Sequence, residues 1–506
     1  MLHVKKTAMT GFNSLRALVR VAGIATLIVG FWPIDCRVLA QGAEGVAGSA
    51  DSDTPDIPIP STAHGTYSPI GEGFASPLDP REALRATQPN TPRPPVQAPP
   101  PEAEKGVWLR YLRQRLQDAE PFVRDTRLKI NSRTYWLSRQ SIDRSHAEAL
   151  TSGGSIAYQS GYLADFMQLR SVLYTSQPIY APVTGAGTDN LTPDQQQITT
   201  LGQANVRIKL AGQEASFGRQ LIRTAFINPR DNRMIPLTFE GAILVPERRK
   251  DQGLDYIGSY LWSYKPRDTD EFIPFSEPLG VKQDEGVLIN GVRHTFNGLT
   301  LGAVNYWIRD TLNTAYGEVD YLWGTGSEQG PTYRISFNNL DQRTVGEQLI
   351  PGAPYNSYQA SARFVAGYRG FVLTTAVSVT GKEANIRDPF GNIPVYTSMH
   401  QSSFERAGEQ AYLLTLSYDF SAMGFEGLKF LVGWGQGIDA INPTTEALEP
   451  NRNLLNLHLD YEPSSGRLEG LRVQLYYSNE QLLNTALPRD KQSEFRAVVN
   501  YSIPLL

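Results

Sequence analysis

Arginine and lysine recur at alternate positions along the chain, which is the spacing of side chains on one face of a β-strand. Arg127, Lys129 and Arg133 lie in one such segment, and Arg207 and Lys209 lie in another. A guanidinium group binds a carboxylate through two parallel hydrogen bonds and stays protonated. A row of such groups predicts repeated weak sites for carboxylate-bearing solutes. The same parity places four more arginines on the polar face of later segments: Arg334, Arg363, Arg472 and Arg496.

Acidic residues occupy the polar face of other segments: Asp255, Glu318, Asp320, Asp419 and Asp460. If the polar faces line a water-filled lumen, one wall is basic and acidic residues lie elsewhere. Such a lumen would orient solutes that carry both charges, since rows of charged side chains are how pores select ions. The structural alternative is that lumen arginines pair with lumen carboxylates and only support the wall.

The chain carries no motif of an enzyme active site. No His-x-x-x-His, Gly-x-Ser-x-Gly or P-loop pattern is present. The single cysteine, Cys36, lies in the N-terminal region, so the rest of the chain has no cysteine nucleophile and no cysteine-based metal site. We therefore expect no enzymatic activity and no cofactor or metal, with a hydrolase site assembled from distant strands as the enzymatic alternative. The histidines beyond the N-terminal region are scattered: His64, His146, His294, His400 and His458.

These side chains must be positioned by β-strands, because apolar and polar residues alternate from Thr126 to the end of the chain. In residues 315–323 the odd positions carry Ala, Gly, Val, Tyr and Trp, whereas Glu318 and Asp320 lie on the other face. Alternation gives each strand one apolar and one polar face. Aromatic residues such as Tyr321 and Trp323 lie near strand ends on the apolar face, as in the girdles of transmembrane barrels. A soluble periplasmic β-protein has the same alternation and is the alternative.

The alternation predicts eighteen strands, an even number, as an antiparallel bacterial barrel requires. Short links such as Asn297-Gly298 alternate with long ones such as 382–409. The sequence therefore predicts an all-β protein, a transmembrane antiparallel β-barrel over residues 126–506. The expected strands lie near 126–138, 154–165, 168–178, 203–211, 213–220, 237–248, 253–264, 286–296, 298–308, 313–324, 331–341, 357–367, 371–381, 410–420, 427–437, 452–462, 469–479 and 493–503.

The N-terminal residues 1–40 have the pattern of an export signal. Basic residues precede a ten-residue apolar run at 22–31, which is too short for a membrane helix of ~20 residues. Small residues at 38 and 40 predict cleavage before Gln41. The alternative is an uncleaved anchor. Export of this kind predicts the outer membrane of a Gram-negative bacterium as the destination of a barrel.

A proline-rich segment follows the export signal. Residues 41–101 hold thirteen of the 34 prolines, a composition that predicts an extended linker without a core. Residues 102–125 predict a short periplasmic helix. Expected partners are outer-membrane lipid, small anionic or zwitterionic solutes and the barrel-assembly machinery, with a cell-wall contact through the proline-rich segment as a further hypothesis. The formal net charge of −4 argues against nucleic acid as a partner.

The most specific motif is Phe-Gly-Arg-Gln at 217–220 followed by Asn-Arg-Met-Ile-Pro-Leu-Thr-Phe-Glu-Gly at 232–241. Two further runs, 418–428 and 494–501, accompany it. Together these motifs resemble the OprD family of substrate-selective outer-membrane porins. The resemblance implies an eighteen-stranded barrel whose third loop folds inward as a constriction, with selective uptake of amino acids or small organic acids. It also implies that four arginines flank or line the constriction: Arg219, Arg223, Arg230 and Arg233.

Two transport alternatives share the alternating pattern. A general diffusion porin has the same strands but no selective constriction. A hydrophobic-solute transporter has an apolar channel, which the basic rows above argue against.

Overall fold

The computed structural model describes residues 108–506, except residue 144 and residues 183–186, 248–253, 325–329, 353, 389, 392, 464–465 and 486–489. The expected export signal (1–40), its cleavage before Gln41 and the proline-rich linker (41–101) lie outside the described residues.

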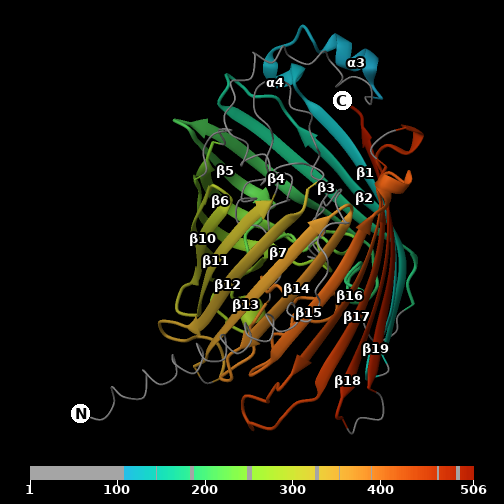
Figure 1. Cartoon of the computed structure of the whole chain (residues 1–506). Helices are drawn as coiled ribbons and strands as arrows, with labels where there is room; N and C mark the ends of the chain where they lie inside the picture. Colours follow the sequence, from blue (N-terminus) through green and yellow to red (C-terminus); the bar gives the residue numbers. More distant parts are fainter. Residues whose placement is uncertain are drawn as a thin grey trace.

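Nineteen strands form one sheet, and successive strands pair antiparallel. The strand β8 (Ile273–Pro274) has two residues and pairs with β7 (Leu254–Lys265), so eighteen strands make the wall. The wall closes where β1 (Arg127–Gln140) pairs with β19 (Lys491–Pro504) (Figure 1). The predicted fold, an antiparallel barrel of eighteen strands, is confirmed. The other wall strands are β2 (His146–Gln159), β3 (Met167–Tyr180), β4 (Ile198–Leu210), β5 (Gln213–Gln220), β6 (Thr238–Pro246), β9 (Val287–Phe296), β10 (Leu299–Ile308), β11 (Leu312–Gly324), β12 (Thr332–Thr344), β13 (Asn356–Tyr368), β14 (Phe371–Thr380), β15 (Gln410–Asp419), β16 (Leu428–Ile438), β17 (Asn451–Tyr461) and β18 (Leu471–Leu483).

The two ends of the barrel differ in the length of their connections. Tight links such as 297–298 and 369–370 lie at one end, which we call the short-turn end. Connections such as 221–237 and 381–409 lie at the other, long-loop end. Outer-membrane barrels place short turns toward the periplasm. Three 3₁₀ turns complete the connections: η3 (Glu277–Leu279), η4 (Phe420–Met423) and η5 (Gly466–Leu468).

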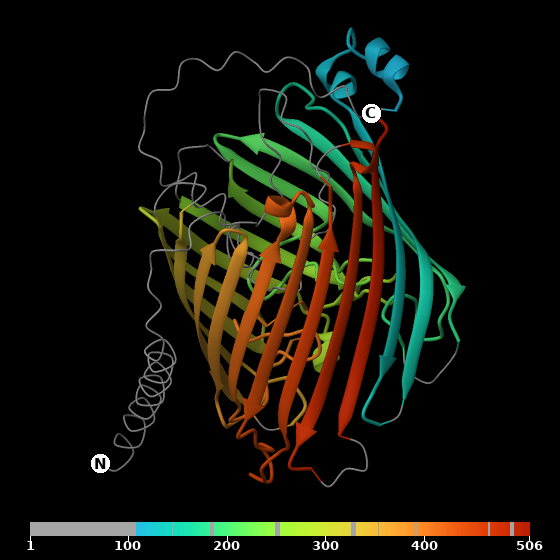
Figure 2. The same cartoon turned by 45° about the vertical axis from the view of Figure 1, so that its right-hand side comes forward.

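Two short helices, α3 (Arg110–Arg115) and α4 (Pro121–Arg124), precede β1 at the short-turn end, beside the C-terminus (Figure 2). They stand where one short helix was expected over residues 102–125, of which the structure describes 108–125. Within the described ranges, no helix has the length and apolar character needed to cross a membrane.

Strand faces follow the predicted parity. On β1, Trp136 is exposed on the outside, whereas Tyr135, Leu137 and Arg133 are buried on the inside. The prediction for the second strand was displaced: residues 154–165 were expected, and β2 covers His146–Gln159. Its first half has weak strand propensity, but it pairs with the full length of β1 from Gln140↔His146 to Arg127↔Gln159. Pairing with a long neighbour thus overrides local preference.

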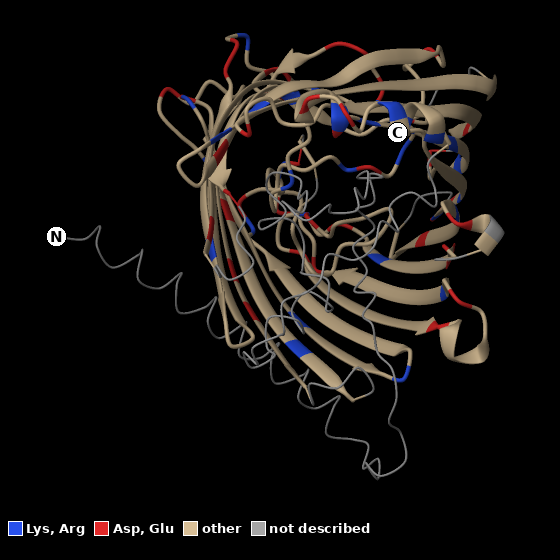
Figure 3. Ribbon diagram, turned by 90° about the horizontal axis from the view of Figure 1, so that it is seen from above, with Lys and Arg blue, Asp and Glu red and all other residues tan. Residues whose placement is uncertain are grey.

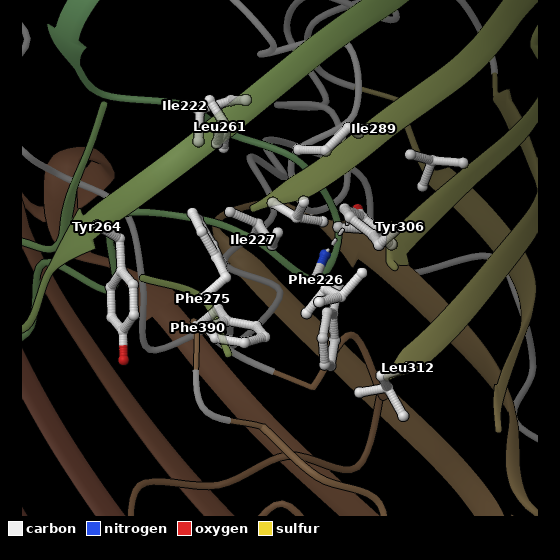
Figure 4. Close-up of a cluster of buried hydrophobic side chains, with 14 of the residues drawn as sticks. Ile222, Phe226, Ile227, Leu261, Tyr264, Phe275, Ile289, Tyr306, Leu312 and Phe390 are labelled. Carbon is white, nitrogen blue, oxygen red and sulfur yellow. Dashed lines mark hydrogen bonds between the residues drawn. The ribbon is translucent and has the colours of Figure 1, made fainter. Parts of the chain in front are cut away.

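The inner face of the wall is not polar throughout. From β6 to β12, inward side chains such as Phe239, Ile289 and Tyr306 are buried in a hydrophobic cluster. Four long-loop connections contribute the rest of this cluster, including Phe226, Phe275, Ile350 and Phe390 (Figure 4). The expectation that a polar strand face lines the lumen does not hold for this part of the wall, because the loops that fold inside exclude water from it.

Candidate pore constriction

The connection 221–237 between β5 and β6 crosses the inside of the barrel. Near its start, the Phe226 backbone N–H donates to the Tyr306 hydroxyl of β10 over 3.1 Å. Near its end, the Tyr135 hydroxyl of β1 donates to the Asn232 carbonyl over 3.0 Å. In the order of the wall, β1 and β10 are almost diametrically opposite. This connection, the third at the long-loop end, is therefore the inward-folded loop that the resemblance to the OprD family implied.

An apolar cluster fixes the first half of this loop. The Phe390 ring lies 4.9 Å from Phe275 and 5.5 Å from Tyr264, centroid to centroid. An isolated β-bridge joins Ile227 to Gly391 of the 381–409 connection. These loops thus share one core with the wall (Figure 4). Because well-packed interiors resist change, this core sets where the loops stand.

Ion pairs join the second half of the loop to β1, beside an apolar cluster in which Met234 and Ile235 are buried with residues of β1. The Arg133 guanidinium donates to both carboxylate oxygens of Asp231, over 2.7 and 3.1 Å, and to the Arg233 carbonyl over 2.6 Å. The Arg233 Nε donates to the Thr188 carbonyl over 3.2 Å. These contacts hold residues 231–233 against the wall through charge-assisted bonds, the stronger class of hydrogen bond.

Arginines outnumber carboxylates where this loop meets β1 and β19. Arg233 lies 3.9 Å from Glu494 and 3.7 Å from Asp189, and Arg139 lies 2.6 Å from Glu494. Among the described residues joined by these ion pairs, five cations face three anions. We call this set the arginine cluster: Arg133, Arg139, Arg233, Arg267, Arg496, Asp189, Asp231 and Glu494.

The arginine cluster sets the charge of its loop carboxylate. Burial alone would raise the pKa of Asp189, but the guanidinium groups of Arg233 and Arg267 hold that pKa below its ordinary value. Asp189 therefore stays ionised at neutral pH and neutralises part of the positive charge of the cluster. A cluster of this kind attracts anions, because its own carboxylates neutralise only part of its charge.

A second charged group lies on the wall from β9 to β13. Arg293 is 3.2 Å from Glu318, and Arg334 is 3.5 Å from Asp320. The Arg363 guanidinium lies 4.3 Å from the ring centroid of Tyr396, a residue of the 381–409 connection. The wall thus carries arginine and carboxylate together at this level, with a tyrosine of the inward loop beside them.

The four arginines expected at the constriction occupy different places. Arg233 lies in the arginine cluster, and Arg223 is buried within the inward loop. Arg230 is half-exposed, adopts φ of 43° and lies 3.7 Å from Asp388 of the 381–409 connection. These three belong to or adjoin the loop that crosses the lumen.

Arg219 does not line the pore. On β5 it shares the outer face with Phe217, while Ser216 and Gln220 are buried on the inner face. Its guanidinium lies 3.8 Å from Glu240 and 4.2 Å from the Phe272 ring centroid. Arg219 was expected to flank or line the constriction; it stands just before the inward loop, but strand parity turns its side chain to the outer face.

The remaining predicted residues face inward at several levels. Arg127 and Lys129 lie near the short-turn end of β1. Arg207 is 3.5 Å from Glu214, and Lys209 is 3.1 Å from Glu247. The rest are placed as follows: Arg472 donates to Asp460 over 2.8 and 3.0 Å, Asp419 lies 3.6 Å from Lys429, Asp255 lies opposite Arg293 in the β7–β9 register, and Arg496 pairs with Glu494.

Positive and negative residues are therefore not on separate walls. Seen from the short-turn end, both kinds are interspersed around the barrel (Figure 3). The expected division into a basic wall and acidic residues elsewhere is wrong, because Arg334 and Arg363 lie beside Asp320. The structural alternative, in which lumen arginines pair with lumen carboxylates, describes many of these residues.

Several residues of the site were not predicted from the sequence. Asp189, Asp231 and Tyr396 lie in loops, where strand parity makes no prediction. Arg139 and Glu494 lie on β1 and β19 with the inward parity of Arg133 and Arg496, so the alternation pattern contained that signal. Across the described parts of the chain, no group of three or more His, Cys, Asp or Glu side chains is placed to hold a metal ion.

Comparisons with known proteins agree with this architecture. The crystal structure of OpdK from Pseudomonas aeruginosa with vanillate has a TM-score of 0.66 at 19% identity, over 76% of this chain and 100% of that chain. OccK2 (OpdF) from the same organism, in complex with glucuronate, has a TM-score of 0.65 at 18% identity with the same two coverages. A BenF-like porin from Pseudomonas fluorescens has a TM-score of 0.68 at 17% identity, again over 76% and 100%.

These likenesses show the fold, and a search of curated proteins gave no match. A scan of the sequence against models of protein families matches residues 120–505 to "outer membrane porin, OprD family". That match spans the whole barrel and its closing strand. The chain is therefore an outer-membrane β-barrel that belongs to the OprD family of porins.

Proposed function

We propose that this porin gives selective, passive uptake of small water-soluble solutes that carry a carboxylate, such as amino acids or small organic acids. The observation that carries the proposal is the arginine cluster, in which five cations face three anions at the inward loop. Two structural relatives are described with vanillate and with glucuronate, which are both carboxylates. The shared ligand chemistry supports the same solute class here.

The proposed mechanism needs no covalent step. A solute carboxylate would compete with Asp189 and Glu494 for the guanidinium groups and would pass from one arginine to the next. A hydrogen bond to a charged group makes a net contribution of about 1.5–3 kcal/mol. This is weak enough for the solute to be released from one arginine to the next when such sites repeat. We include Arg139 and Arg230 among the contact residues because their side chains are partly exposed, at 26% and 34%.

We infer that residues 1–40 direct export and are removed before Gln41, and that the barrel-assembly machinery inserts the chain in the outer membrane. The proline-rich segment 41–101 then lies in the periplasm, where it can reach the cell wall.

Single-channel recording in planar lipid bilayers tests the proposal. Benzoate and glutamate are added to the full mature chain, and the half-blocking concentration is measured. Loss of one guanidinium contact in Arg139→Gln is expected to raise it roughly tenfold, which corresponds to ~1.4 kcal/mol. Arg343→Gln is the matched control, because Arg343 lies on the outer face of β12 with its own partner, Asp341.

An open channel that no carboxylate blocks would refute the proposal and favour a general diffusion porin. An equal change of the half-blocking concentration in Arg139→Gln and Arg343→Gln would also refute the proposal, because the effect would then not depend on the arginine cluster.

A further inference from the structure

The segment before β1 presents a surface of aromatic and basic side chains. Trp108 and Tyr111 are 70% and 71% exposed, and Leu112 is also exposed. The Arg115 guanidinium lies 5.4 Å from the Tyr111 ring centroid. Residues 108–117 carry three arginines and no acidic residue. Helical spacing places Trp108, Tyr111, Leu112 and Arg115 on one face.

This surface is held rigidly on the barrel by its other side. The backbone N–H groups of Trp108 and Leu109 donate to the carbonyls of Pro504 and Leu505, over 3.1 and 3.0 Å. The Arg113 guanidinium donates to the carbonyls of Arg124 and Thr126, over 2.9 and 3.0 Å. The segment that carries the exposed aromatic face is therefore fixed to the barrel. Packing within the described chain does not account for the exposure of these aromatic side chains.

The position of the segment relative to the membrane follows from the strands. Aromatic side chains such as Tyr321, Trp323, Phe371 and Tyr501 are exposed on the outer wall near the short-turn end, where a girdle meets the membrane interface. Pro504, which bonds Trp108, lies three residues beyond Tyr501 on β19. Three residues of a strand tilted by ~40° advance about 7–8 Å along the barrel axis. This rise puts Trp108 at the level of the lipid headgroups, measured along the barrel axis.

We propose that residues 108–117 form a headgroup-binding surface that takes anionic phospholipid of the periplasmic leaflet. Tryptophan and tyrosine favour the interface because their rings are apolar at one end and polar at the other. Arginines near an anionic surface add an attraction for lipid phosphate. The surface would anchor the start of the barrel, at the seam between β1 and β19, to the leaflet from which the N-terminal segment extends.

Native mass spectrometry of the full chain tests the charge requirement. Dioleoylphosphatidylglycerol and dioleoylphosphatidylcholine are supplied in equal amounts, and the lipid retained by each variant is counted. We expect a preference for the anionic lipid that falls at least threefold in the Arg110→Gln, Arg115→Gln double variant. Arg309→Gln, Arg343→Gln is the matched control, since both residues are exposed at the long-loop end.

Bromolipid quenching tests the depth. In vesicles of phosphatidylcholine with one-fifth phosphatidylglycerol, the full chain should lose more fluorescence to shallow bromines than Trp108→Phe does. Deep bromines should not separate the two. Unchanged lipid preference in the double variant, or no difference between Trp108→Phe and the unmodified chain, would overturn the proposal. Retention of heat-modifiable mobility shows that each variant has a folded barrel.

Discussion

The apolar core inside the barrel predicts that one buried ring controls the size of the pore. Phe390 is 1% exposed and packs against Phe275 and Tyr264. Truncating a buried Phe to Ala costs about 3–5 kcal/mol. At ~1.4 kcal/mol for each tenfold change, Phe390→Ala shifts the ratio of docked to undocked loop by at least about two powers of ten. The loops then spend a measurable time away from the wall.

Single-channel conductance in planar bilayers measures this shift. We expect Phe390→Ala to raise the mean conductance and the open-channel noise, and to weaken block by carboxylates. Phe337→Ala is the matched control, because Phe337 lies on the outer face of β12 and is 42% exposed. The barrel of both variants should keep its heat-modifiable mobility. A Phe390→Ala channel with unchanged conductance, noise and block would refute the idea that the core positions the constriction.

Three other substitutions probe the same loops. Burial holds the pKa of the His400 imidazole well below its ordinary value of ~6.5. Docking of the 381–409 connection is therefore weakened by about 1.4 kcal/mol for each pH unit below ~6.5. Channel noise should rise from pH 7.5 to 5.5, and His400→Gln should abolish the rise. Asp231→Asn removes the carboxylate partner of a buried β1 arginine at a cost of about 3–5 kcal/mol, and tryptic cleavage within 221–237 should become faster. Gly435→Val brings a Cβ within 2.3 Å of the Met399 sulfur, so it should displace the 381–409 connection and raise conductance without unfolding the barrel. Unchanged noise, cleavage or conductance, respectively, would contradict each expectation.

The strands of the wall were predictable because one face meets lipid and the other meets loops or water. This imposes a two-residue period on the alternation of apolar and polar side chains. The expected strand at 213–220 has the bounds of β5, and most others agree within a few residues. The strand at 154–165 was misplaced because residues 146–153, apart from Leu150, are small or polar and have little strand preference of their own. Only the pairing with β1, which the local sequence does not show, extends β2 to His146.

The site was predictable only where strand parity applies. Arg133 and Arg496 face inward as expected, and Arg219 faces outward because it shares the parity of Phe217. Asp189 and Asp231 escaped notice because a loop residue has no parity, and its neighbours depend on where the loop folds. A local pattern gives the face of a strand but not the partner that reaches it from another loop.

The inward loop is held by two kinds of contact that respond differently to their surroundings. Its first half joins an apolar core through Phe226 and Ile227, which salt and pH leave almost unchanged. Its second half is held by the Arg133–Asp231 ion pair, whose attraction depends on charge state, and by Met234 and Ile235, which lie in a second apolar cluster with β1. Substitutions at the polar residues 228–233 can therefore change the charges that we propose to meet the solute, while the apolar contacts on both sides keep the loop across the lumen. This division lets one barrel retain a constriction while its selectivity varies.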